Sequence, residues 1–125
     1  MAGVIGRLKT VVIDAADMDA VAQFWSAVLD IPVVSREDDW TTLEGRGVRL
    51  AVQLAPDHVP PQWPDPDSPQ QLHLDVQVED ADEAERQVLA LGATRLQDPP
   101  DAENFRVFAD PAGHPFCLVY DVPGS

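Results

Sequence analysis

Two stretches decide the fold of this chain: residues 10–17, Thr-Val-Val-Ile-Asp-Ala-Ala-Asp, and residues 73–80, His-Leu-Asp-Val-Gln-Val-Glu-Asp. In each stretch a run of strand-forming residues leads to an aspartate that can cap a helix. Apolar residues then recur with the spacing of one helical face. Because this pattern occurs twice, it predicts the same structural unit twice.

The first copy begins with a predicted strand over residues 8–13, and a helix follows Asp17. We expect Pro32 to end this helix, because proline cannot continue it. Three short strands are then predicted at 33–36, 40–44 and 48–54, with turn residues between them. The apolar face of the helix is Val21, Phe24, Trp25, Val28 and Leu29.

The second copy begins with strict alternation over residues 71–78, which predicts a half-buried strand. Asp80 caps the second helix and Gly92 supplies a left-handed stop. Further strands are predicted at 94–96, 105–109 and 116–120. The strand should turn Leu72, Leu74, Val76 and Val78 towards the helix, and His73, Asp75 and Gln77 away from it; the helix should bury Ala81, Ala84, Val88 and Leu91.

A proline-rich connector separates the two copies. Residues 55–70 contain six prolines, so no helix or central strand can run through them. A length of 125 residues is ordinary for one domain. We therefore expect a single α+β domain over 1–125, with two βαβββ modules at about 8–54 and 71–120.

The charge of the chain excludes several kinds of partner. Twenty-two acidic and eight basic residues give a net charge of −14, which repels nucleic acids and anionic membranes. No apolar run is long enough to span a bilayer. Cys117 is the single cysteine, so no disulfide can form within the chain. We expect a cytoplasmic protein that binds a small molecule, with neither nucleic acid nor membrane as partner.

Several short motifs accompany the paired modules. They are Phe24-Trp25, Leu29-Asp30-Ile31, the strand from His73, Leu91-Gly92-Ala93 and the ending Asp110-Pro-Ala-Gly-His-Pro-Phe-Cys117. Together they resemble the vicinal oxygen chelate family, which includes glyoxalase I, extradiol dioxygenases, and fosfomycin and bleomycin resistance proteins. The resemblance covers about residues 8–120 and is strongest to the small glyoxalase-like branch. It implies that the modules form a cup-shaped, partly open mixed sheet with a helix packed on each, and that the chain forms a homodimer.

In enzymes of this family the cup holds a divalent metal. The resemblance places Thr10, Ala51, His73 and Cys117 at the usual ligand positions, and only His73 matches the family pattern. The one metal site that the sequence still allows is a soft site with three ligands, Gln53, His73 and Cys117. Because a neutral hydroxyl and a methyl group are not ligands for such metals, we expect no metal and no other cofactor.

The same cup supplies the candidate functional residues. His73 and Asp75 leave one face of a strand and could act as acid and base, or could be polar groups bonded to loop backbone. Trp63 offers a binding surface or plugs the joint between modules, and Cys117 is a ligand contact or a small buried apolar residue. The remaining candidates for ligand binding are Thr10, Trp40, Gln53 and Phe105.

These residues leave three functions open. The first is metal-independent binding of a small molecule, of the sequestering or resistance type. The second is a lyase or isomerase that uses His73 and Asp75 as acid and base. The third is a metal-dependent lyase of the glyoxalase type.

Overall fold

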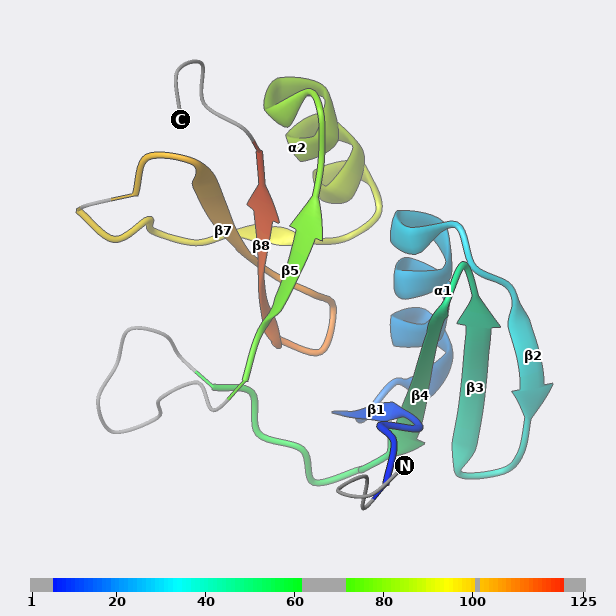
Figure 1. Cartoon of the computed structure of the whole chain (residues 1–125). Coiled ribbons are helices and arrows are strands. Elements are labelled where there is room, and N and C mark those ends of the chain that lie inside the picture. The colour runs from blue at the N-terminus through cyan, green and yellow to red at the C-terminus, as the bar shows by residue number, and fades with distance from the viewer. Residues whose placement is uncertain (1–5, 62–71, 101, 121–125) are drawn as a thin grey trace. The chain divides into compact units, whose positions relative to one another are not determined.

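The computed structural model describes residues 6–61, 72–100 and 102–120 (Figure 1). The chain divides into two compact units, Met1–His58 and Val59–Ser125. Within the described residues each unit contains one helix and one open sheet of four strands. The predicted α+β class and the repeated βαβββ pattern are therefore confirmed.

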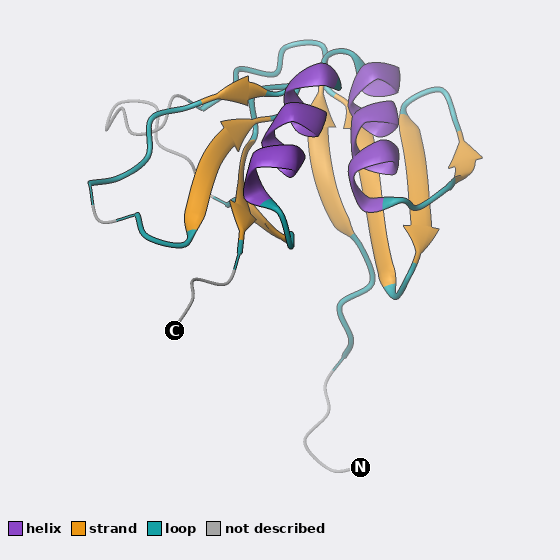
Figure 2. Cartoon of the chain, turned by 90° about the horizontal axis from the view of Figure 1, so that it is seen from above, coloured by secondary structure: helices purple, strands orange, loops and turns teal. Residues whose placement is uncertain are grey.

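The first unit has the sheet order β1-β4-β3-β2, in which β1 runs parallel to β4 and the other pairs are antiparallel. Helix α1 lies along one face of this sheet (Figure 2). The side chain of Asp17 caps α1 by accepting the backbone N–H of Ala20 at 3.1 Å. The elements are β1 (Val11–Ala15), α1 (Met18–Leu29), β2 (Val33–Arg36), β3 (Trp40–Gly45) and β4 (Val48–Leu54).

The buried face of α1 explains how this unit is held together. Phe24 and Trp25 are almost wholly buried, and their rings meet edge to face at 5.1 Å. Ile13 and Leu43 of the sheet are buried as well, as expected for the side that the helix covers. The helix ends at Leu29 and its C-cap is Asp30, whose φ of 54° is left-handed, so the chain leaves the helix before it reaches Pro32, the stop that the sequence predicts.

The second unit repeats this plan with the order β5-β8-β7-β6 and a parallel β5–β8 pair. Asp80 caps α2 by accepting the backbone N–H of Glu83 at 3.1 Å. Phe108 and Phe116 are fully buried and stack with their ring centroids 5.5 Å apart. The elements are β5 (Leu74–Gln77), α2 (Ala81–Ala90), β6 (Thr94–Arg95), β7 (Phe105–Ala109) and β8 (Pro115–Val119).

Several sequence predictions are wrong in detail. The strand predicted over 8–13 begins only at Val11, and the strand predicted over 71–78 begins only at Leu74. Leu72 therefore has no sheet partner among the described residues to fix its direction, and it is 82% exposed although the alternation predicts burial. Helix α2 ends at Ala90, so Leu91 is also exposed, and the left-handed stop at Gly92 has a φ of 113°.

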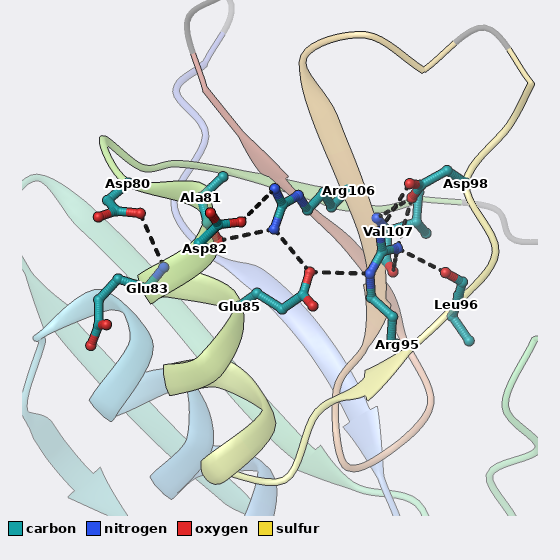
Figure 3. Close-up of polar contacts among 10 residues, drawn as sticks. All are labelled: Asp80, Ala81, Asp82, Glu83, Glu85, Arg95, Leu96, Asp98, Arg106 and Val107. Atoms are coloured by element: carbon teal, nitrogen blue, oxygen red, sulfur yellow. Dashed lines mark hydrogen bonds and ion pairs between the residues drawn. The ribbon is translucent and has the colours of Figure 1, made fainter.

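Charged side chains tie α2 to its sheet (Figure 3). Glu85 on the helix accepts from Arg95 at 3.3 Å and from Arg106 at 3.1 Å, and Arg106 also reaches Asp82 at 2.9 Å. Because Arg106 pairs in register with Leu118, this face of the sheet looks towards α2. No helix in the described part of the chain is long and apolar enough to cross a membrane.

Candidate functional site

The face of the second sheet that turns away from α2 carries the polar residues predicted from the alternation. Register pairs Asp75 with Cys117 and Cys117 with Val107, so these side chains leave the same face. Leu74 and Phe116 form the neighbouring pair and point to the opposite face. Leu74 is only half-buried, and Phe116 is fully buried.

His73 and Asp75 are in direct contact on this face. The Nε2 of His73 lies 3.2 Å from the Oδ1 of Asp75, and the side chains are 36% and 62% exposed. His73 precedes the first residue of β5, so it sits at the end of the strand that holds Asp75. A carboxylate in contact with an imidazole nitrogen fixes the orientation of the ring, which suits either ligand recognition or proton transfer.

Cys117 lies beneath this pair. Its side chain is buried, and burial together with the charge and hydrogen bond of Asp75 raises the pKa of the thiol to about 11. The thiol is therefore protonated at neutral pH and is a poor nucleophile. The three residues bring an imidazole nitrogen, a carboxylate oxygen and a thiol sulfur within 4.8 Å of one another.

The chemistry of these three donors decides which metal they fit. Zinc is bound in proteins by imidazole, carboxylate and thiolate groups, which are the three kinds of group in this cluster. Manganese and magnesium prefer oxygen ligands, and in this cluster Asp75 is the single residue that offers oxygen. The donor atoms of the cluster therefore fit zinc. His73, Asp75 and Cys117 would hold the ion, which would supply Lewis-acid polarisation of a ligand oxygen. Gln53, the third ligand that the sequence offers, belongs to the first unit, so its part in such a site stays a prediction.

The ligand-binding candidates of the first unit lie on one face of its sheet. Trp40 and Gln53 are direct cross-strand partners, and Gln53 is in turn paired with Asp14. Gln53 is exposed, and Trp40 is half-buried. Thr10 immediately precedes β1 and is half-buried. Ala51, at the family ligand position, is wholly buried.

Two further candidates belong to the second unit. Phe105 on β7 pairs with Val119, two residues beyond Cys117 on β8, which places its side chain on the face of the His73–Asp75 pair. Phe105 is half-buried. Trp63 lies outside the described residues. The cup shared by the two modules therefore stays a prediction, and each candidate is placed within its own unit.

Sequence reasoning missed a basic group in the first unit. Arg7, Lys9 and Arg49 line one groove there, although more than forty positions separate the first from the last. Because these residues lie far apart in the sequence, no local run of basic residues indicates that they form a group. The pairing of β1 with β4 could have indicated it, because this pairing brings the residues before β1 next to the β3–β4 hairpin.

Comparison with known proteins places this geometry in a family. The model of the glyoxalase-like domain matches residues 10–119, which is nearly the whole chain. The chain belongs to the glyoxalase-like domain family. This match confirms the resemblance to the vicinal oxygen chelate superfamily that the sequence motifs indicated. A search of curated proteins gave no match.

Solved structures of glyoxalase-like proteins share the fold. A glyoxalase/bleomycin resistance protein/dioxygenase family enzyme from Burkholderia phytofirmans superposes with a TM-score of 0.72 at 19% identity, covering 94% of this chain and 100% of that one. The fosfomycin resistance protein FosX from Listeria monocytogenes gives a TM-score of 0.72 at 14% identity, covering 96% and 97%. At such identities the likeness concerns the fold alone.

Proposed function

We propose that this glyoxalase-like protein binds a small molecule on the His73 face of its second sheet, without a resident metal, in the manner of a sequestering or resistance protein. The proposal rests on one observation: His73 and Asp75 form an exposed polar pair 3.2 Å apart. Phe105 adds an aromatic surface on the same face. Apolar area with a few placed polar groups is the usual composition of a small-molecule site.

A ligand screen by thermal shift, followed by calorimetry on the strongest binder, tests this function. His73→Ala should weaken binding by about 1–3 kcal/mol, because a polar group of the ligand loses its partner. Stability should change little, since His73 is exposed. Gln87→Ala is the control, because Gln87 is an exposed polar residue of α2, which covers the opposite face of this sheet. Equal losses in both variants would contradict the proposal.

Leu74→Ala gives the opposite signature. Leu74 lies on the other face of β5 and is half-buried. Its truncation should cost about 1–2 kcal/mol of stability, less than the roughly 2–5 kcal/mol of a fully buried leucine. Ligand affinity should stay unchanged. If His73→Ala unfolds the protein while altering no affinity, His73 is a structural residue.

The contact between His73 and Asp75 also favours a second candidate function. A carboxylate that orients an imidazole is a common arrangement for general acid–base catalysis, so the pair suits a lyase or isomerase acting on a small metabolite. The variants His73→Ala and Asp75→Asn separate the two functions. If turnover of a screened compound falls in both while its binding survives, the protein is an enzyme. If binding falls and no turnover exists, sequestration stands.

One structural neighbour has been solved with manganese, a metal that the donor atoms of the cluster in this chain do not fit. FosX from Listeria monocytogenes has been solved with Mn(II) and sulfate, at 15% identity and a TM-score of 0.70. Manganese prefers oxygen ligands, and the cluster in this chain contains one carboxylate, one imidazole and one thiol. We therefore propose that manganese-dependent catalysis is not the function of this cluster.

A further inference from the structure

A groove in the first unit is lined by other residues than those assigned so far to the His73 face. It has a volume of about 630 Å³ and lies between the residues that lead into β1, 7–11, and the β3–β4 hairpin, 44–49. Ligand sites for small molecules have volumes of roughly 300–1,000 Å³. Among the described residues, those that line the groove all belong to the first unit.

The groove is positively charged in an otherwise acidic protein. Arg7, Lys9 and Arg49 line it, and Glu44 is the one acidic residue among the described residues that line it. The whole chain has only eight basic residues against 22 acidic ones. Three of the eight are thus gathered around one hollow, where they oppose the general repulsion of anions by a chain of net charge −14.

Arg49 is held in a defined position within this lining. Arg49 and Glu44 are direct cross-strand partners, and the Nη1 of Arg49 donates to the Oε1 of Glu44 at 3.0 Å. The Nε of Arg49 is buried and makes no hydrogen bond within the described part of the chain. A buried N–H without an acceptor is costly, so an anion whose oxygen reached this group would gain a hydrogen bond that the protein leaves unmade.

Thr10 connects the groove with the sequence prediction. The sequence predicts Thr10 as a ligand-binding residue. In the structure it lines the groove together with its neighbours Lys9 and Val11. A hydroxyl group can donate a hydrogen bond to an anion, and a guanidinium group presents a fork of donors that matches two oxygens. The positive charge of the groove, its hydrogen-bond donors and its volume therefore all favour a small anion as the ligand.

We propose that this groove binds a small organic anion through a phosphate or carboxylate group, with Arg7, Lys9 and Arg49 as its cationic partners. Phosphate and carboxylate share the oxyanion chemistry that the groove recognises. The proposal rests on residues of the first unit only, so it does not depend on the His73–Asp75 site. Its failure and the failure of that site are measured separately.

Titration of the ¹⁵N-labelled protein with inorganic phosphate, and separately with pyruvate, tests the proposal at constant ionic strength. Saturable shifts should centre on residues 7–11 and 44–49. The double variant Arg7→Gln/Lys9→Gln should raise the dissociation constant about tenfold or more, as expected when hydrogen bonds to charged groups are lost. Both residues are exposed, so the fold should tolerate the change. Arg49→Lys, which keeps the charge but removes the Nε donor, should also weaken binding.

Arg46→Gln is the matched control. Arg46 belongs to the same hairpin and carries the same charge, but it pairs with Asp30 and does not line the groove. It should change the dissociation constant less than about twofold, since an exposed charge that is paired with Asp30 and does not line the groove is screened by solvent. Binding of only one of the two anions supports the proposal and narrows the ligand class. Equal weakening in control and double variant, shifts centred elsewhere, or no saturable shift with either anion would overturn it.

Discussion

The carboxylate of Asp98 accepts two hydrogen bonds from the guanidinium of Arg95, at 2.7 and 2.9 Å. The same carboxylate accepts the backbone N–H of Val107 at 3.0 Å, so it joins the loop after β6 to strand β7. Arg95 also donates to the carbonyl oxygens of Leu96 and Val107 and lies 5.0 Å over the ring of Phe108. This contact therefore anchors the short edge strand β6 to the core of its unit.

The Asp98–Arg95 contact should make stability depend on pH. Hydrogen bonding from Arg95, more than the opposing effect of burial, lowers the pKa of Asp98, and the Val107 N–H lowers it further. A lowered pKa in the folded state contributes stability that is present above the unfolded value near 3.9 and is lost as pH falls through the folded value. Asp98→Asn should therefore cost about 1–2 kcal/mol at pH 7 and much less at pH 3, as measured by urea unfolding.

Glu103→Gln is the control for this prediction. Glu103 is an exposed carboxylate of the same loop. Its neutralisation should change stability by less than about 0.5 kcal/mol at either pH, as is usual for surface substitutions. If Asp98→Asn costs the same at pH 3 as at pH 7, its effect does not come from the charge.

Gly113 should tolerate no side chain. Its φ is 90°, and a Cβ at this position would overlap the Cβ of Pro60. Gly113→Ala should therefore cost about 2–4 kcal/mol, the sum of left-handed backbone strain and a forced displacement of Pro60. Gly47 has a similar φ of 79°, but a Cβ there would meet nothing within 4 Å, so Gly47→Ala should cost only about 1 kcal/mol. Thermal unfolding of both variants checks the difference, and equal costs would show that Pro60 moves freely.

Local pattern predicted the elements that one segment of chain can specify by itself. The helices after Asp17 and Asp80 follow from a capping side chain and a run of apolar residues, and both caps are present. The strands over 33–36, 48–54 and 105–109 have the predicted bounds. The repeat also placed His73 and Asp75 on one face, because alternation fixes the direction of neighbouring side chains.

Contacts between distant segments could not be predicted. The alternation predicts that Leu72 is buried, but in the described part of the chain the pairing of β5 begins only at Leu74, and the side chain of Leu72 is exposed. Glu85 and Arg106 meet only because the sheet brings β7 under α2. Arg7 and Arg49 come together for the same kind of reason. Alternation and helical spacing determine the faces of the elements, and register decides which charges share a site.

The family resemblance leads us to expect a homodimer in solution. Closed two-fold dimers are the commonest assembly of single-domain proteins. Light scattering should give about 27 kDa, twice the 13.6 kDa of one chain. A mass of one chain at tens of micromolar would contradict this expectation.

The metal content of the purified protein tests whether the cluster of His73, Asp75 and Cys117 acts without a metal. Thr10 and Ala51 stand where the family resemblance places metal ligands, and neither a hydroxyl nor a methyl group replaces them. We therefore expect protein purified without added metal to carry well under one equivalent of nickel, zinc, iron or manganese by elemental mass spectrometry. The result that would contradict this is stoichiometric zinc that a chelator removes and that Cys117→Ser no longer retains. Such zinc would assign His73, Asp75 and Cys117 to a metal centre, because these three residues supply the nitrogen, oxygen and sulfur donors that zinc accepts.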